Sequence, residues 1–129
     1  MARRIAALVA GAALAFAPAA GAAPFRATLT AATHTPKVNA KWPYTVRVAD
    51  AAGKPLKATI TAQLVDPLGG VHAVEFGDTH RLVVARPFTG VFRDFIRFPP
   101  ESKGFKLTLR FIVQAKGAKV VLTYWITAR

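Results

Sequence analysis

Several segments of this chain place apolar side chains at every second position with mostly polar side chains between them, a pattern that an extended strand converts into two different faces. Within Lys57–Leu64, Ala and aliphatic residues occupy every second position and polar residues lie between them. The same alternation runs through Tyr44–Ala49, Leu107–Val113 and Val120–Ile126. Because successive side chains of a strand point in opposite directions, each segment presents one apolar face to a core. No helical periodicity appears after residue 22, so we expect an all-β protein.

Turn residues separate these segments at intervals of about 8 to 14 residues, a spacing typical of an antiparallel sandwich. The clearest turn signals are Asp50–Pro55, Asp66–Gly70 and Lys116–Gly117. We therefore expect an immunoglobulin-like antiparallel β-sandwich of seven or eight strands, after an N-terminal signal peptide. The fold is expected to form a single domain over residues 23–129.

Four further segments are expected to form strands. Phe25–Thr30 is expected to be the first strand, Val71–Phe76 a weaker strand, and Arg81–Ala85 another short strand. Gly90–Phe98 is rich in strand-forming residues, but Asp94 falls on the same face as its apolar side chains. A β-bulge near Asp94, or a position at a sheet edge, would explain this irregularity.

The first 22 residues follow the order that is typical of a secretory signal peptide. Met1–Arg4 is cationic, Ile5–Phe16 is an apolar run, and Ala20–Ala22 supplies the small residues of a cleavage site. As a helix the run would rise about 18 Å, short of the roughly 30 Å hydrocarbon core of a bilayer. We expect residues 1–22 to be cleaved and the product to be secreted or periplasmic, in the cell envelope, with no integral membrane segment.

The composition limits how the exported part is stabilised and what it binds. The net charge of the full chain is +12, and it falls to +10 for the exported part once Arg3 and Arg4 leave with the signal peptide. The chain has no cysteine, so its stability depends on a packed core rather than on disulfides. The charge favours anionic surfaces, but no nucleic-acid-binding motif is present, and we expect no nucleic acid as partner. A monomer or a weak homo-oligomer is expected.

A resemblance to a known group of proteins rests on three segments. Trp42–Asp50, preceded by Pro36–Asn39 and followed by Gly53–Leu56, resembles the opening strands of bacterial exported immunoglobulin-like domains, including the YtkA-like group. Gly90–Asp94 is similar to the segment that such domains place before their penultimate strand. The resemblance implies the fold and export, and it implies no activity.

Residues suited to catalysis are scarce. Ser102 is the only serine, and its surroundings lack the pattern of a nucleophile on a strand-to-helix turn. Asp50 and Asp66 lie at turns, where short acidic residues commonly stabilise the backbone. We therefore expect no enzyme activity and no cofactor.

A metal site for copper or zinc is the alternative function. The chain has three histidines, His34, His72 and His80, and Asp78 precedes His80 by two residues. In a strand, residues at this spacing share a face and could ligate one ion together.

The final hairpin suggests a binding surface. A turn at Lys116–Gly117 would place apolar and cationic side chains together on its outer face. They are Lys106, Arg110, Ile112, Val121 and Trp125. An exposed tryptophan beside cations is suited to binding a protein or an anionic polymer. Alternatively, both faces of the sheet are covered and Trp125 is ordinary packing. We expect a non-enzymatic binding or structural module of the cell envelope.

Overall fold

The alternating segments form strands, and the computed structural model describes residues 24–129 of the chain. The predicted signal peptide lies outside these residues.

A short 3-10 turn, η2 (Pro100–Ser102), precedes the last two strands. No helix of the described range is long and apolar enough to cross a membrane. The eight strands are β1 (Phe25–Ala31), β2 (Lys41–Asp50), β3 (Lys57–Val65), β4 (Val71–Ala73), β5 (Arg86–Thr89), β6 (Val91–Arg97), β7 (Lys106–Ala115) and β8 (Ala118–Thr127).

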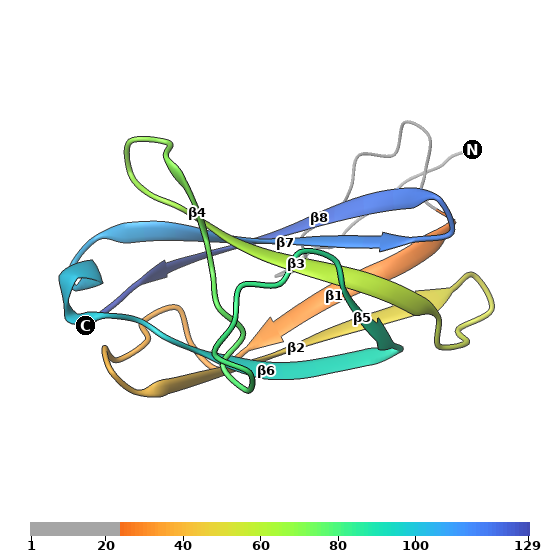
Figure 1. Ribbon diagram of the computed structural model, residues 1–129, viewed down its shortest axis with the longest axis horizontal. Coiled ribbons are helices and arrows are strands. Elements are labelled where there is room, and N and C mark those ends of the chain that lie inside the picture. The colour runs from red at the N-terminus through yellow and green to blue at the C-terminus, as the bar shows by residue number, and fades with distance from the viewer. Residues whose placement is uncertain (1–23) are drawn as a thin grey trace.

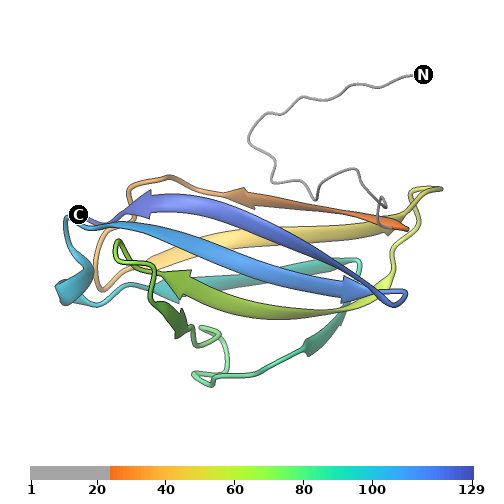
Figure 2. The same ribbon diagram turned by 90° about the horizontal axis from the view of Figure 1, so that it is seen from above.

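Two antiparallel sheets pack face to face, as Figures 1 and 2 show. The first sheet has the order β1-β2-β6, and the second has the order β4-β3-β7-β8. Strand β5 pairs with residues 57–60 of β3 and β4 with residues 63–65, so the two short strands share one edge of β3. This arrangement confirms the predicted β-sandwich, and its strand order is compatible with an immunoglobulin-like domain.

The core consists of the inward-facing side chains of both sheets. Burying a large apolar side chain contributes about 1.5–3 kcal/mol, so the sum over many such residues replaces the disulfides that the chain lacks. The largest fully buried apolar side chains include Phe76, Phe111, Ile60, Leu109, Leu122, Ile126, Val46, Val48 and Val113.

Trp42 belongs to this core as well. Its side chain is only 2 % exposed and lies where β2 begins, near one end of the sandwich. The indole Nε1–H donates to the carbonyl oxygen of Thr33 at 2.7 Å, so burial leaves its polar group satisfied. Trp42 is therefore a core residue at the start of β2, with its polar group bonded to the neighbouring loop.

The β7–β8 hairpin has the predicted turn and register. Lys116 and Gly117 both have positive φ angles, 49° and 70°, as a two-residue type I′ turn requires. Ile112 pairs with Val121, and Thr108 pairs with Trp125. The local pattern thus determined which residues share the outer face.

A segment after β1 covers part of the outer edge of β8. The N–H of Thr127 donates to the carbonyl of His34 at 2.8 Å, and that of Arg129 donates to the carbonyl of Pro36 at 2.9 Å. The N–H of Val38 returns a bond of 2.9 Å to Arg129. These bonds fasten residues 34–38, between β1 and β2, to the end of β8 and to Arg129.

One of the weaker strand predictions was wrong, and another extended too far along the chain. Strand β4 ends at Ala73 instead of Phe76, and no strand covers Arg81–Ala85, because β5 begins at Arg86. The cause is Phe76, whose side chain is fully buried. To insert this ring into the core, the chain leaves the edge of β3 and crosses to β6 before it returns as β5, as Figure 1 shows.

The irregular segment around Asp94 has no β-bulge. Along β6, Phe92, Asp94 and Ile96 pair in unbroken register with Val46, Tyr44 and Trp42 of β2. Strand β6 lies at the edge of its sheet, which was the second explanation offered by the sequence. The Asp94 carboxylate faces the core and is 7 % exposed. The pattern is irregular because a carboxylate is buried, and the register does not shift.

Candidate binding surfaces

The binding residues predicted on the last hairpin lie together on the outer face of the second sheet. Ile112 and Val121 are directly opposite each other and half-buried. The side chains that point into the core alternate with others that point outward on β7 and β8. The outward-pointing ones include Lys106, Arg110 and Trp125. The five side chains therefore form one surface, which we call the Trp125 face.

Trp125 is exposed, in contrast to the alternative of ordinary packing. Its side chain is 47 % accessible, and the Lys106 ammonium lies 5.6 Å from the centre of its ring. The imidazole of His34 stacks on the indole at 3.9 Å between ring centres, with an interplanar angle of 12°. His34 Nδ1 also lies 2.6 Å from the Trp125 carbonyl oxygen. His34 and Lys106 thus fix the position of the indole at the sheet edge.

Arg110, by contrast, is already engaged within its own sheet. Its Nε and Nη2 groups both donate to Oε1 of Gln63 on β3, at 3.0 and 2.7 Å. A guanidinium held in this way has fewer donors to offer a ligand than a free one. Arg110 therefore keeps its charge on the Trp125 face but has fewer N–H groups available for a ligand than the sequence suggested.

The structure does not bring the predicted metal ligands together. Residues 24–129 contain no group of three or more His, Cys, Asp or Glu side chains that could hold a metal ion. His34 belongs to the Trp125 stack, and His80 lies in the β4–β5 crossing with a φ angle of 56°. His72 Nε2 lies 2.8 Å from Asp66 Oδ2, and this contact is the main cause of the lowered pKa of the Asp66 carboxyl.

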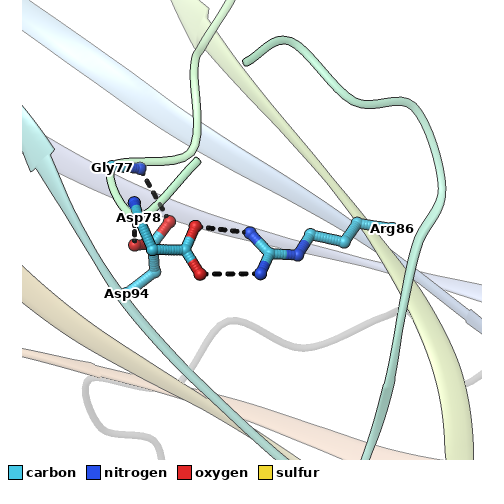
Figure 3. A network of polar contacts seen from close by, with 4 residues as sticks. All are labelled: Gly77, Asp78, Arg86 and Asp94. Atoms are coloured by element: carbon cyan, nitrogen blue, oxygen red, sulfur yellow. Dashed lines mark hydrogen bonds and ion pairs between the residues drawn. The ribbon is translucent and has the colours of Figure 1, made fainter. Parts of the chain in front are cut away.

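Asp78, the fourth predicted ligand, belongs to a polar network that ties the β4–β5 crossing to β6 (Figure 3). The Asp94 carboxylate accepts the backbone N–H groups of Gly77 and Asp78 at 2.9 and 3.0 Å. The Asp78 carboxylate in turn accepts two hydrogen bonds of 2.7 Å from the Arg86 guanidinium. A bidentate pair of this kind is strong, so Asp78 is engaged with Arg86.

Aromatic rings and a buried hydroxyl surround this network. The Arg86 guanidinium lies 5.0 Å from the ring centres of both Phe76 and Phe92. Tyr44 is directly opposite Asp94, and its buried hydroxyl has no hydrogen-bond partner among the described residues. Burial raises the pKa of the Tyr44 hydroxyl above its usual value, and the negative charge of Asp94 raises it further.

Two ionisable groups in the network have pKa shifts in opposite directions. Burial raises the pKa of the Asp94 carboxyl, and the nearby Asp78 charge adds to this rise. Hydrogen bonds from Arg86 lower the pKa of Asp78. The network anchors the crossing segment to β6, and each of its carboxylates is already hydrogen-bonded.

Sequence reasoning missed the charge on the outer face of the first sheet, β1-β2-β6. Its outward-facing residues include five exposed cations and no carboxylate. We call this set the cation row. It consists of Arg26, Arg47, Arg93, Lys41 and Arg97.

The acidic residues lie elsewhere. Asp94 faces the core, and the other five lie in turns, loops or at the end of β2, outside the outward phase of the strands. The two ion pairs within residues 24–129 are Asp66–His72 and Asp78–Arg86, and neither includes a member of the cation row. Both outer faces are therefore cationic without acidic neighbours.

A signal for the cation row was present in the sequence. Arg26, Arg47 and Arg93 each lie in a predicted strand at the position between two inward-facing side chains, and side-chain alternation places such a residue on the outer face. The sequence did not show that their three strands are neighbours.

In the comparisons with known proteins, the chain matches no protein-family model and no curated protein.

Proposed function

We propose that this chain is an exported, non-catalytic module that binds an anionic polymer of the cell envelope. The observation that supports the proposal is the separation of charge described above. Nine cations lie on the outer faces of β1, β2, β6, β3, β7 and β8, and no carboxylate accompanies them. A surface of this kind attracts polyanions and repels other cations.

The reactive groups of the described residues support a non-catalytic role. The Ser102 hydroxyl donates to the carbonyl of Pro99 at 2.6 Å within η2, and no base is bonded to it. The buried carboxylate, Asp94, accepts two backbone hydrogen bonds that hold the crossing segment. These groups serve the fold, and the polar surface left over is cationic.

Export and ancestry are parts of the same proposal. The signal peptide predicted at residues 1–22 would place the sandwich where anionic envelope polymers occur. A relation to exported immunoglobulin-like domains of the YtkA-like group is supported by β2, the turn at Gly53–Pro55 and β3, which follow one another as in that resemblance.

The proposal is tested by retention on isolated envelope material. We expect the purified protein to be retained at about 50 mM salt and to be released by about 0.5 M salt, because electrostatic binding to a polyanion weakens steeply with ionic strength. Material stripped of its anionic polymers should not retain the protein. Retention that survives both treatments would contradict an electrostatic polymer contact.

A further inference from the structure

We propose that the cation row, on the face of β1-β2-β6, binds a flexible linear polymer whose repeating units are joined by phosphodiesters. This inference rests on the proposed function and names both the face and the chemistry of the ligand. It assigns the polymer to the sheet opposite the Trp125 face.

The register of the strands places the cations along a diagonal. Arg26 is opposite Ala49 of β2, and Arg47 lies two residues from Ala49 on the same outer face. Arg47 is opposite Val91 of β6, and Arg93 lies two residues beyond Val91. Each step thus moves one strand across and two residues along. An extended chain could follow this row in single file.

The row continues to the far end of the sheet. Beyond Arg93, β6 carries Arg97, which is directly opposite Lys41 at the start of β2. Measured along β2, the distance from Ala49 to Lys41 is about 27 Å at roughly 3.4 Å per residue. A row of this length fits several repeats of a linear polymer and exceeds what a single small anion needs.

The cation type favours phosphate. Four of the five residues in the row are arginines, whose planar guanidinium can donate two parallel hydrogen bonds to one phosphate group. The guanidinium groups of Arg26, Arg47 and Arg93 have no hydrogen-bond or ion-pair partner within residues 24–129. The outer face of the second sheet carries three lysines instead, Lys57, Lys106 and Lys119, and Arg110 on that face is bonded to Gln63.

An electrostatic cost at the end of the row also indicates an anion. Lys41 and Arg97 are like charges directly opposite each other, an arrangement that destabilises a sheet. Both lie against the ring of Phe95, at 4.6 and 5.7 Å from its centre. A phosphate placed between them would replace this repulsion with two attractive contacts.

A linear polymer fits this face better than a membrane surface does. Phe95 is the one aromatic among the outward-facing residues of β1, β2 and β6, and it is half-buried between Lys41 and Arg97. This face exposes Pro43 but no aromatic or long aliphatic side chain that would reach below lipid headgroups. We therefore make binding to anionic vesicles an outcome of the test.

The experiment compares two variants that lose the same charge on opposite faces. The row variant is Arg26→Gln/Arg47→Gln/Arg93→Gln, and the matched control is Lys57→Gln/Lys106→Gln/Lys119→Gln. All six side chains are exposed, and urea unfolding of both variants verifies that the fold is kept. The probe is labelled poly(glycerol phosphate), titrated by fluorescence anisotropy at several salt concentrations.

We expect the row variant to lose at least roughly tenfold in affinity, and the control to change much less. The slope of log affinity against log salt should fall by about 2 in the row variant, because each lost phosphate contact contributes about 0.7. Acrylamide quenching of Trp125 should stay unchanged when the polymer binds, since Trp125 lies on the other face.

Three results would overturn the inference. Equal losses in both variants would show that the charge acts diffusely, and a loss in the control alone would move the site to the Trp125 face. Tighter binding to phosphatidylglycerol vesicles than to the polymer would assign the row to a lipid surface. In the first two cases the proposed function survives. The proposed function fails together with the inference if the unmodified protein binds neither this polymer nor envelope material.

Discussion

Lys41 and Arg97 lie directly opposite each other on β2 and β6, and no carboxylate shares their face of the sheet. Like charges at this spacing repel, and the contacts that compensate are the Phe95 ring, which both cations approach, and a hydrogen bond of 3.1 Å from Arg97 to the Asn39 carbonyl. The arrangement costs stability in the isolated protein. An anionic ligand bound between the two cations, as proposed above, would offset this cost.

The first prediction concerns this pair. Lys41→Glu should raise the free energy of unfolding by about 0.5–1 kcal/mol relative to Lys41→Gln, because it creates an attractive cross-strand pair with Arg97. Urea unfolding at low salt measures the difference. At about 1 M salt, where the Debye length is near 3 Å, the two variants should converge. Equal stability of the two variants at low salt would show that Lys41 and Arg97 do not interact.

The second prediction concerns the buried carboxylate. Asp94→Asn should lower the free energy of unfolding by about 1–3 kcal/mol, because an amide can accept from Gly77 or Asp78 but leaves the other N–H without an acceptor. The loss should be accompanied by faster amide exchange in the crossing segment. Unchanged exchange at Gly77 and Asp78 would contradict the anchoring role of Asp94.

The pKa of Asp94 adds a pH dependence to this prediction. Because burial raises that pKa above the value of about 4 in the unfolded chain, the native state binds more protons in the interval between the two values. The stability that wild type owes to this group therefore falls as pH rises through this interval. We expect the stability difference between wild type and Asp94→Asn to narrow with rising pH. A difference that widens would mean that the pKa is lowered.

The third prediction concerns the hydroxyl of Tyr44. Because this buried group has no hydrogen-bond partner among the described residues, Tyr44→Phe should leave the free energy of unfolding unchanged or raise it by up to about 1 kcal/mol. Thermal or urea unfolding measures the change. A loss of more than about 1 kcal/mol would reveal a partner for the hydroxyl, such as an ordered water.

The fourth prediction concerns the close approach of the crossing segment to β6. A Cβ at Gly77 would lie 2.5 Å from ring carbons of Phe95 and would also meet its carbonyl oxygen. Gly77→Ala should therefore lower the free energy of unfolding by about 1–3 kcal/mol. Gly53→Ala serves as the comparison, since that position has open space and only a positive φ of 84°. A smaller loss at Gly77 than at Gly53 would contradict the close contact.

Part of the Trp125 face was predictable from the sequence, because its residues belong to one hairpin. The turn at Lys116–Gly117 fixes the register, and the register fixes that Ile112 and Val121 are neighbours. The exposure of Trp125 was not predictable in the same way. The stacking of His34 on the indole was not predictable either, because His34 comes from a segment 91 residues earlier in the chain.

The buried network was beyond sequence reasoning for a similar reason. Phe76 reads as part of a strand, yet its burial pulls the chain away from β3 and brings Gly77 and Asp78 to Asp94. Asp94 was recognised as an irregularity, but a bulge and an edge position both accounted for it. Only the packing of the crossing segment against β6 showed that the carboxylate is buried and bonded.

The sequence by itself determined the strands, the faces that they bury and the pairing within the last hairpin. These features follow from dihedral angles and side-chain alternation, which are local properties of the chain. Tertiary structure alone decided that β6 lies beside β2, and so that Arg26, Arg47 and Arg93 form one row. The order of strands in a sheet depends on how segments that are distant in the sequence bury their apolar faces together. The local alternation shows that a charged residue faces outward, but it does not show which strand lies beside it.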